Sequence, residues 1–168
     1  MTRYDAAIAP LPAPAIAELR GDPGAARALL VAAGLTVPSR PNSAASTGER
    51  EALWLGPKRW LVFAPAAEER WLEAHVGSAA REPLLAAAIV SDMFAGIAVR
   101  GAGSRDVVAQ GTPLDLDALA ADGATMTDLF GVAALLRPLP APGIGIAVWV
   151  DRSLARFVAE SLEAANGA

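Results

Sequence analysis

The 168-residue sequence contains no cysteine, one histidine and one lysine, and only 5% of its residues are aromatic. Without cysteine the chain cannot form disulfides, supply a thiolate nucleophile, or hold iron–sulfur clusters and the usual structural zinc sites. A catalytic triad built on the single histidine, His75, would lack a recognisable nucleophile, because no G-x-S-x-G pattern is present. We therefore expect His75 to be an ordinary residue on a helix face.

Positive charge and long apolar runs are also scarce. Lys58-Arg59 is the only adjacent basic pair and the formal net charge is −4, whereas nucleic-acid binders usually carry a basic stripe. The longest apolar run, Leu84 to Val90, has seven residues, far fewer than the roughly 20 that a transmembrane helix needs. The first five residues include Asp5 and are followed by several prolines, unlike a signal peptide. We expect a cytoplasmic protein that binds neither nucleic acid nor membrane.

What the chain has in excess is apolar residues. They make up 54% of the sequence against 19% charged residues, and the mean hydropathy is +0.36. An ordinary domain has about 45–50% apolar residues even with glycine included, and about 25% charged residues. Alanine accounts for part of the excess, because it packs into helices without creating a sticky surface. The remainder belongs to the core or to an exposed patch, and large exposed patches indicate a partner.

The length is typical of one domain, since domains usually have about 100–150 residues. We expect residues 1–14 to be an extended N-terminal arm, because prolines follow one another there, and residues 15–168 to be a single α+β domain. Residues 38–48 are predicted to be a surface loop. Strands are predicted at 15–20, 53–55, 60–63, 84–90, 97–100, 127–136 and 144–150. Helices are predicted between Asp22 and Gly34, and at 66–75, 104–110 and 152–165.

The predicted elements repeat. A strand–helix–strand–strand–helix order occurs at about 15–80 and again at about 95–166. In both copies an Arg-Gly pair, Arg20-Gly21 and Arg100-Gly101, separates the first strand from the first helix. A tryptophan also falls in the strands that follow. The pattern predicts a duplicated α+β fold built from two pseudo-repeats.

Few residues have the spacing of a functional site. Gly101-Ala102-Gly103 begins like a dinucleotide-binding turn, but Asp106 stands where the third glycine belongs. Its negative charge would compete with a phosphate for the helix N-terminus. We therefore interpret this segment as a tight turn into a helix.

Several acidic and aromatic residues are each compatible with two roles. Asp115 and Asp117 would share one face of an extended segment and could bind a cation or share a proton. Because no further ligand lies nearby in the sequence, helix capping and loop solvation are the favoured roles. Asp92 could act as a base at a strand end, although Ser-Asp pairs commonly form turns. The tryptophans could stack on a planar ligand, but core packing is favoured. We predict no catalytic, cofactor-binding or metal-binding residue.

One long segment has a recognisable pattern. Val99 to Leu116 reads as an arginine-ended strand, a glycine turn, Arg-Asp-Val-Val, and then Gly-Thr-Pro-Leu-Asp-Leu. It resembles the gamma subunit family of heterotetrameric sarcosine oxidase, in which a cysteine is usual at Thr112 and a proline at Gly103. The pattern at Met126–Phe130 also departs from that family. Further matches, in family order over about residues 16–165, are Pro41-Asn42-Ser43, Leu53-Trp54-Leu55-Gly56-Pro57 with Trp60-Leu61-Val62, Val90-Ser91-Asp92 and Asp151-Arg152-Ser153-Leu154-Ala155.

The resemblance implies a reduced form of the folate-binding aminomethyltransferase-like fold. It further implies an accessory, non-catalytic subunit that docks on the larger subunits of a sarcosine oxidase-like flavoenzyme and stabilises them. FAD, FMN, NAD and tetrahydrofolate would then be bound by those subunits and none by this chain. The reaction of the complex would be oxidative demethylation of sarcosine, a step in one-carbon metabolism. A docking surface would also explain the apolar excess and would make the isolated chain prone to self-association.

A second hypothesis uses the same fold differently. The chain could be a stand-alone folate-binding or one-carbon-transfer protein, with Asp92 or Asp115 as the base in a polar cleft. Length weighs against this hypothesis, because the aminomethyltransferases are about twice as long.

Overall fold

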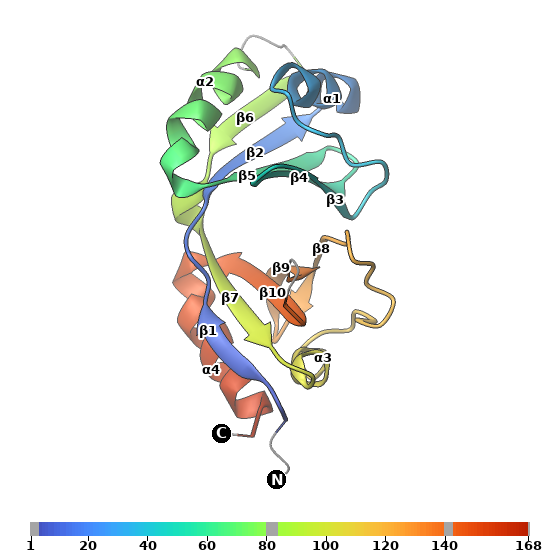
Figure 1. The fold of residues 1–168 in the computed structure, drawn as a ribbon, viewed down its shortest axis with the longest axis vertical. Helices are drawn as coiled ribbons and strands as arrows, with labels where there is room; N and C mark the ends of the chain where they lie inside the picture. The colour runs from blue at the N-terminus through green and yellow to red at the C-terminus, as the bar shows by residue number, and fades with distance from the viewer. Residues whose placement is uncertain (1–3, 80–83, 140–142, 168) are drawn as a thin grey trace. The chain divides into compact units, whose positions relative to one another are not determined.

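The computed structural model describes residues 4–79, 84–139 and 143–167. The chain divides into two compact units, one of residues 13–91 and one of residues 1–12 with 92–168. Each unit has a five-stranded antiparallel sheet and two α-helices (Figure 1). The predicted α+β class with a duplicated architecture is thereby confirmed. In the described part of the chain, no helix combines the length and the hydrophobicity that crossing a membrane requires.

In the unit of residues 13–91 the sheet has the order β3-β4-β5-β2-β6. Its elements are β2 (Ala15–Gly21), α1 (Pro23–Ala32), β3 (Ser43–Thr47), β4 (Arg50–Gly56), β5 (Arg59–Ala64), the 3₁₀ turn η1 (Ala66–Glu68), α2 (Glu69–Ala79) and β6 (Leu85–Ile89). Both helices lie on one face of this sheet (Figure 1). Leu30 of α1 and Leu72 of α2 pack there against strand residues such as Leu19 and Trp60. This cluster is a hydrophobic core of the unit.

The ends of α1 follow from its sequence. The Asp22 carboxylate accepts a hydrogen bond from the backbone N–H of Ala25 (2.9 Å), which satisfies a helix-terminal donor. Pro23 occupies the first turn, where no amide donor is needed. At the other end Gly34 has φ +73°. This left-handed conformation turns the chain back toward the helix, so that the N–H of Leu35 donates to the carbonyl of Leu30 (2.9 Å). The predicted cap and stop are both confirmed.

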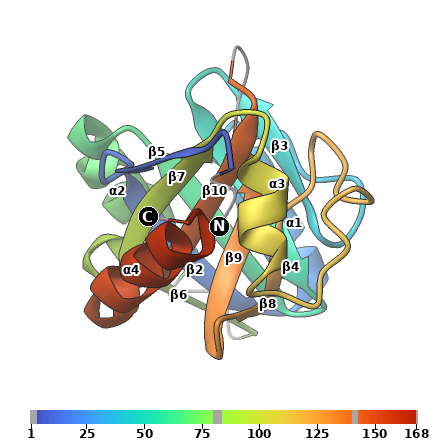
Figure 2. The ribbon, with the colours of Figure 1, turned by 90° about the horizontal axis from the view of Figure 1, so that it is seen from below.

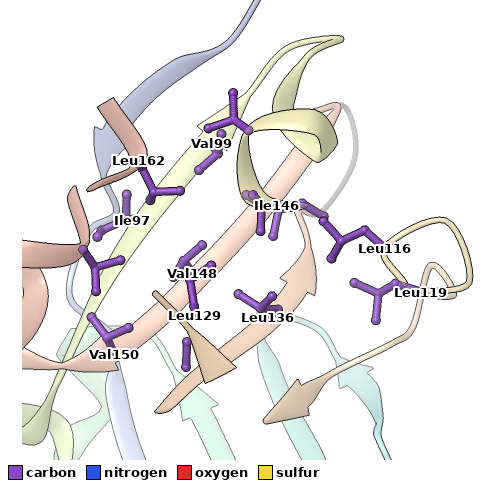
Figure 3. Close-up of a cluster of buried hydrophobic side chains, with 14 residues drawn as sticks. Ile97, Val99, Leu116, Leu119, Leu129, Leu136, Ile146, Val148, Val150 and Leu162 are labelled. Atoms are coloured by element: carbon purple, nitrogen blue, oxygen red, sulfur yellow. The ribbon is translucent and has the colours of Figure 1, made fainter. Parts of the chain in front are cut away.

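The second unit has the sheet order β1-β7-β10-β9-β8. Its elements are β1 (Ala7–Pro10), β7 (Phe94–Arg100) preceded by the 3₁₀ turn η2 (Ser91–Met93), α3 (Ser104–Ala109), β8 (Thr125–Leu129), β9 (Val132–Pro138), β10 (Gly145–Asp151), the 3₁₀ turn η3 (Arg152–Leu154) and α4 (Ala155–Ala165). Figure 2 shows α3 and α4 on one face of this sheet. Its core includes Val99, Val148 and Leu162, and Leu116 and Leu119 join it from the loop after α3 (Figure 3).

The two sheets have equivalent strand orders. β3-β4-β5-β2 corresponds to β8-β9-β10-β7, and each set is completed by a fifth strand antiparallel to β2 or β7. The fifth strand comes from different places, because β6 follows its unit's helices whereas β1 comes from the N-terminal arm. The sequence predicted the repeat, but with two strands between the two helices of each copy where the structure has three. In the first copy β3 was missed, and in the second β8 and β9 were predicted as one strand.

Two predictions about strands were wrong. Residues 127–136 do not form one strand, because Phe130 and Gly131 make a two-residue turn between β8 and β9 with φ +53° and +83°. Two successive positive φ values are typical of a type I′ turn, which usually requires Asn-Gly rather than Phe-Gly. The predicted loop at 38–48 contains β3, which is the edge strand of its sheet and pairs with β4. The serine and threonine residues of β3 suit the partly solvated edge of a sheet. The same residue types are common in loops, and for that reason the composition predicted a loop.

The N-terminal arm, predicted to be extended, carries β1. Ala7 to Pro10 pair with Ile97 to Arg100 along the outer edge of β7. Proline is tolerated in such a strand because its missing N–H can face away from the ladder. Asn166, after α4, holds the start of the arm through its Nδ2 atom, which donates to the carbonyl of Ala6 (3.0 Å). Residues 4–12 of the arm are thus an integral part of the second unit.

Candidate functional site

The glycine turn at residues 101–103 is occupied by the protein's own backbone. Gly101 has φ +113°, and a Cβ atom there would overlap the carbonyl oxygen of Asp5. The N–H of Gly103 donates to that same oxygen (2.9 Å). The turn therefore binds the N-terminal arm in the position where a dinucleotide-binding turn would bind phosphate. It is the helix-entry turn that the sequence predicted.

The equivalent turn of the other unit has the same construction. Gly21 has φ +143°, and its Cβ would overlap the carbonyl oxygen of Leu84, which precedes β6. The N–H of Asp22 donates to that oxygen (2.9 Å). The Arg-Gly pairs noticed in the sequence thus serve one structural purpose in both units. The glycine of each pair lets the chain pass close to a residue shortly before the fifth strand of the sheet, and the chain then enters α1 or α3.

Asp115 and Asp117 do not form a paired carboxylate site. The segment is a turn rather than an extended strand, because Asp115 Oδ1 accepts hydrogen bonds from the N–H groups of Asp117 (3.0 Å) and Ala118 (3.4 Å). Asp117 lies instead 3.7 Å from the Arg105 guanidinium. The premise of a shared face was wrong. The favoured role of helix capping is not what the structure shows either, because no helix lies in the fully described segment between α3 and β8, and Asp115 caps a turn in that loop instead.

Asp92 lies at the surface in η2, with its side chain fully exposed. Its carboxylate is 3.7 Å from Arg152 Nη2, and its backbone carbonyl accepts a hydrogen bond from Arg152 Nε (2.8 Å). An exposed carboxylate beside a guanidinium lacks the burial that makes a strong general base. The interaction joins η2 to η3, the two 3₁₀ turns at the ends of the paired strands β7 and β10.

His75 belongs to a stacked group on α2. Its ring is 4.2 Å from that of Trp71 between centroids, and its Nδ1 lies 2.7 Å from the Trp71 carbonyl oxygen. The Arg50 guanidinium covers the same indole at 3.7 Å from the ring centroid and pairs with Glu68 (2.6 Å). Trp71 thus receives a cation–π contact, and the group ties β4 to α2. His75 is a helix-face residue, as expected.

The other tryptophans serve packing. Trp54 and Trp60 stack at 6.1 Å between ring centroids with an interplanar angle of 20°, and Trp60 is buried in the core of its unit. Trp149 is buried against its own sheet. The interpretation that favoured the core over ligand stacking is therefore supported. Among the residues that the structure describes, no three histidine or acidic side chains are grouped to hold a metal ion.

Exposed apolar side chains are the feature that sequence reasoning did not locate. Met93 of η2 is 56% exposed, Leu154 of η3 37%, and Phe157 of α4 48%. Arg152 brings the two segments together, because it bonds to the carbonyls of both Asp92 and Phe94. Periodicity alone could not find these residues, since Phe157 follows the same apolar pattern as the buried Val158 and Leu162. Each of the three is an apolar side chain that the fold of its own unit leaves partly in solvent.

Two solved structures define the class of fold. Aminomethyltransferase T of the glycine cleavage system from Bartonella henselae is 16% identical, with a TM-score of 0.67 over 96% of this chain and 46% of that chain. Heterotetrameric sarcosine oxidase from Corynebacterium sp. U-96, solved in complex with pyrrole 2-carboxylate, contains a chain that is 20% identical. The TM-score is 0.86 over 99% of this chain and 86% of that chain. The protein has the aminomethyltransferase-like fold that its sequence predicted.

The family is defined by sequence. The model of the sarcosine oxidase, gamma subunit family matches residues 19–133, more than half of the chain. The chain belongs to that family, and the resemblance drawn from Val99–Leu116 is confirmed. Comparison with curated proteins found no match.

Proposed function

We propose that the chain is an accessory, non-catalytic subunit of a heterotetrameric sarcosine oxidase-like flavoenzyme. The observation that carries the proposal is the family match over residues 19–133. The subunit would dock on larger, flavin-bearing subunits and stabilise their assembly. Those subunits would bind FAD, FMN, NAD and tetrahydrofolate, and the complex would oxidise sarcosine or a related secondary amine.

Docking would work through burial of apolar surface. Permanent complexes often bury 2,000 Å² or more, and their interfaces are more apolar than ordinary protein surface. The exposed Met93, Leu154 and Phe157 offer side chains of this kind, and Val31 and Ile144 are more exposed still. Removing a large aliphatic or aromatic side chain from water contributes roughly 1.5–3 kcal/mol.

The proposal is tested by recovering the chain with its partners. A tagged chain, expressed at its native level in the source cells, is expected to elute with chains that carry FAD or FMN, detected by their visible flavin absorbance. Expressed alone, it is expected to self-associate in size-exclusion chromatography. A monodisperse monomer that recovers no flavoprotein would contradict the proposal.

The same material tests the stand-alone hypothesis. Calorimetric titration of the isolated chain with tetrahydrofolate is expected to show no binding up to high micromolar concentration, because Asp92 is solvent-exposed and Asp115 is used within its own turn. Saturable binding would instead favour a folate-binding protein.

A further inference from the structure

The hairpin turn between β4 and β5 borders an open depression of about 500 Å³. Its lining includes Arg20, Leu55, Gly56, Pro57, Lys58 and Arg59. Gly56 pairs with Arg59 across the hairpin, so Pro57 and Lys58 form its two-residue tip. Arg20 lies beside them because β2 pairs with β5 in a register that places Arg20 opposite Arg59. The basic hairpin surface is defined here as Arg20, Pro57, Lys58 and Arg59.

Positive charge on this surface exceeds the negative charge available to balance it. Glu18 Oε1 accepts a hydrogen bond from Arg59 Nε (2.6 Å) and lies 2.9 Å from Arg20 Nη2, so one carboxylate serves two guanidinium groups. Lys58 has no ion pair within the described part of the chain. The nearby Asp22 carboxylate is used at the N-terminus of α1. The surface is therefore locally basic in a chain whose net charge is −4.

Two hydrogen bonds to backbone carbonyls of the turn hold it in place. Trp54 Nε1 donates to the Gly56 carbonyl (2.7 Å), and the N–H of Gly21 donates to the Lys58 carbonyl (3.1 Å). The side chains of Pro57 and Lys58 are exposed. A turn whose backbone is already ordered loses little conformational entropy when it meets a partner. The Lys58 ammonium thus projects from a rigid base and is not used by the fold.

We propose that the basic hairpin surface docks on an acidic segment of a larger subunit of the complex. This inference rests on the proposed function and adds the chemistry of the contact. Partner carboxylates would pair with Lys58 and with the outward-facing donors of Arg20, while Pro57 packs against the same segment. A wide depression that is open to solvent suits a protein surface better than a small anion, since ligand pockets usually enclose most of their ligand.

The test uses purified large subunits and the full chain carrying Lys58→Glu. Arg70→Glu on α2 is the matched control, because it reverses one exposed charge in the same unit and changes the net charge equally. Immobilised large subunits and biolayer interferometry give association and dissociation rates at two salt concentrations. Lys58→Glu is expected to weaken binding about tenfold or more, mainly through slower association, and to reduce its salt dependence. Arg70→Glu is expected to stay within about twofold of the native chain.

The other outcomes separate this inference from the proposed function. If the native chain and both variants bind equally well, the docking surface lies elsewhere and the inference fails while the proposed function stands. Equal weakening by both variants would show a general charge effect and would also overturn the inference. If the native chain does not bind the large subunits, the proposed function fails. Should Lys58→Glu lower the melting temperature, Lys58→Gln replaces it, with an expected weakening of about threefold.

Discussion

The six-membered ring of Trp149 lies directly against the backbone of Gly96. The two residues face each other on the paired strands β10 and β7, and the Trp149 indole is only 7% exposed. A Cβ atom on residue 96 would be 2.6 Å from Trp149 Cη2, closer than real carbon contacts come. The sheet can bury this indole only because residue 96 has no side chain.

Replacing Gly96 with alanine is therefore expected to destabilise the protein. The ring must move out of its packed position, and overpacking of this kind typically costs about 1–3 kcal/mol. Gly56→Ala is the matched control, because a Cβ there meets no atom within 4 Å and its φ is not positive. Urea denaturation followed by tryptophan fluorescence measures both variants. Equal stabilities for Gly96→Ala and the native protein would show that the ring is free to shift.

Asn166 is expected to hold the N-terminal arm in place. Its side chain is buried at 1% exposure and donates to Ala6, while its backbone carbonyl accepts from the N–H of Tyr4 (3.3 Å). Asn166→Ala leaves the Ala6 carbonyl without this donor, and such a loss costs about 1–3 kcal/mol. Hydrogen exchange by NMR should show that the exchange rates of the β1 amides rise in Asn166→Ala relative to the native protein, whereas those of the β10 amides do not. Gln110→Ala, which removes an exposed side-chain bond to Ala165, should leave β1 protected.

The cap of α1 gives a second measurable contribution to stability. Asp22→Ala removes the carboxylate that accepts from Ala25, and loss of such a cap typically costs about 1 kcal/mol. Asp92→Ala removes a carboxylate that makes only an exposed ion pair, so its cost should be about 0.5 kcal/mol or less. Thermal unfolding of the two variants at pH 7 makes the comparison. A larger loss for Asp92→Ala would mean that this carboxylate has a role the structure does not show.

Asp151 is expected to titrate abnormally. The Ser153 hydroxyl and then the Ser153 backbone N–H donate to its carboxylate, and these bonds hold its pKa below the ordinary value of 3.8. A lowered pKa in the folded state stabilises the fold above pH 3.8, and this contribution is lost as the pH falls through the lowered pKa. Ser153→Ala should move the pKa upward, toward but not fully to 3.8, because the backbone donor remains.

Carboxyl-carbon NMR shifts of Asp151 follow this titration directly. Ser161→Ala is the control, since it removes a serine hydroxyl bonded to the Phe157 carbonyl and should leave the Asp151 titration unchanged. An unshifted Asp151 in Ser153→Ala would show that the hydroxyl does not stabilise the carboxylate.

Some of the fold was predictable because its causes are local. Asp22, Pro23 and Gly34 delimit α1 by capping, by ring geometry and by positive φ, and each effect spans only a few residues. The Arg-Gly pairs marked the start of both repeats for a similar reason, since glycine was needed at each turn. The turn at Asp115 also has a local cause, because an aspartate readily accepts from N–H groups two and three positions later.

Other features depended on segments distant in sequence. β1 and β3 have little apolar pattern of their own and become strands only because β7 and β4 offer them an edge. The Phe130-Gly131 turn was hidden by apolar residues on both sides, and it is supported by a hydrogen bond from the Phe130 N–H to the Gly111 carbonyl (2.7 Å). Neither signal is present in a short window of sequence.

The sequence by itself determined the α+β class, the duplication, the family and the absence of any cysteine-based chemistry. It could do so because periodicity, glycine turns and composition are properties of the chain alone. The tertiary structure decided where the carboxylates point, that the arm completes a sheet, and which side chains remain at the surface. Exposure and charge balance arise only when distant segments meet, and for that reason the basic hairpin surface and the exposed Met93, Leu154 and Phe157 could be located only in the folded chain.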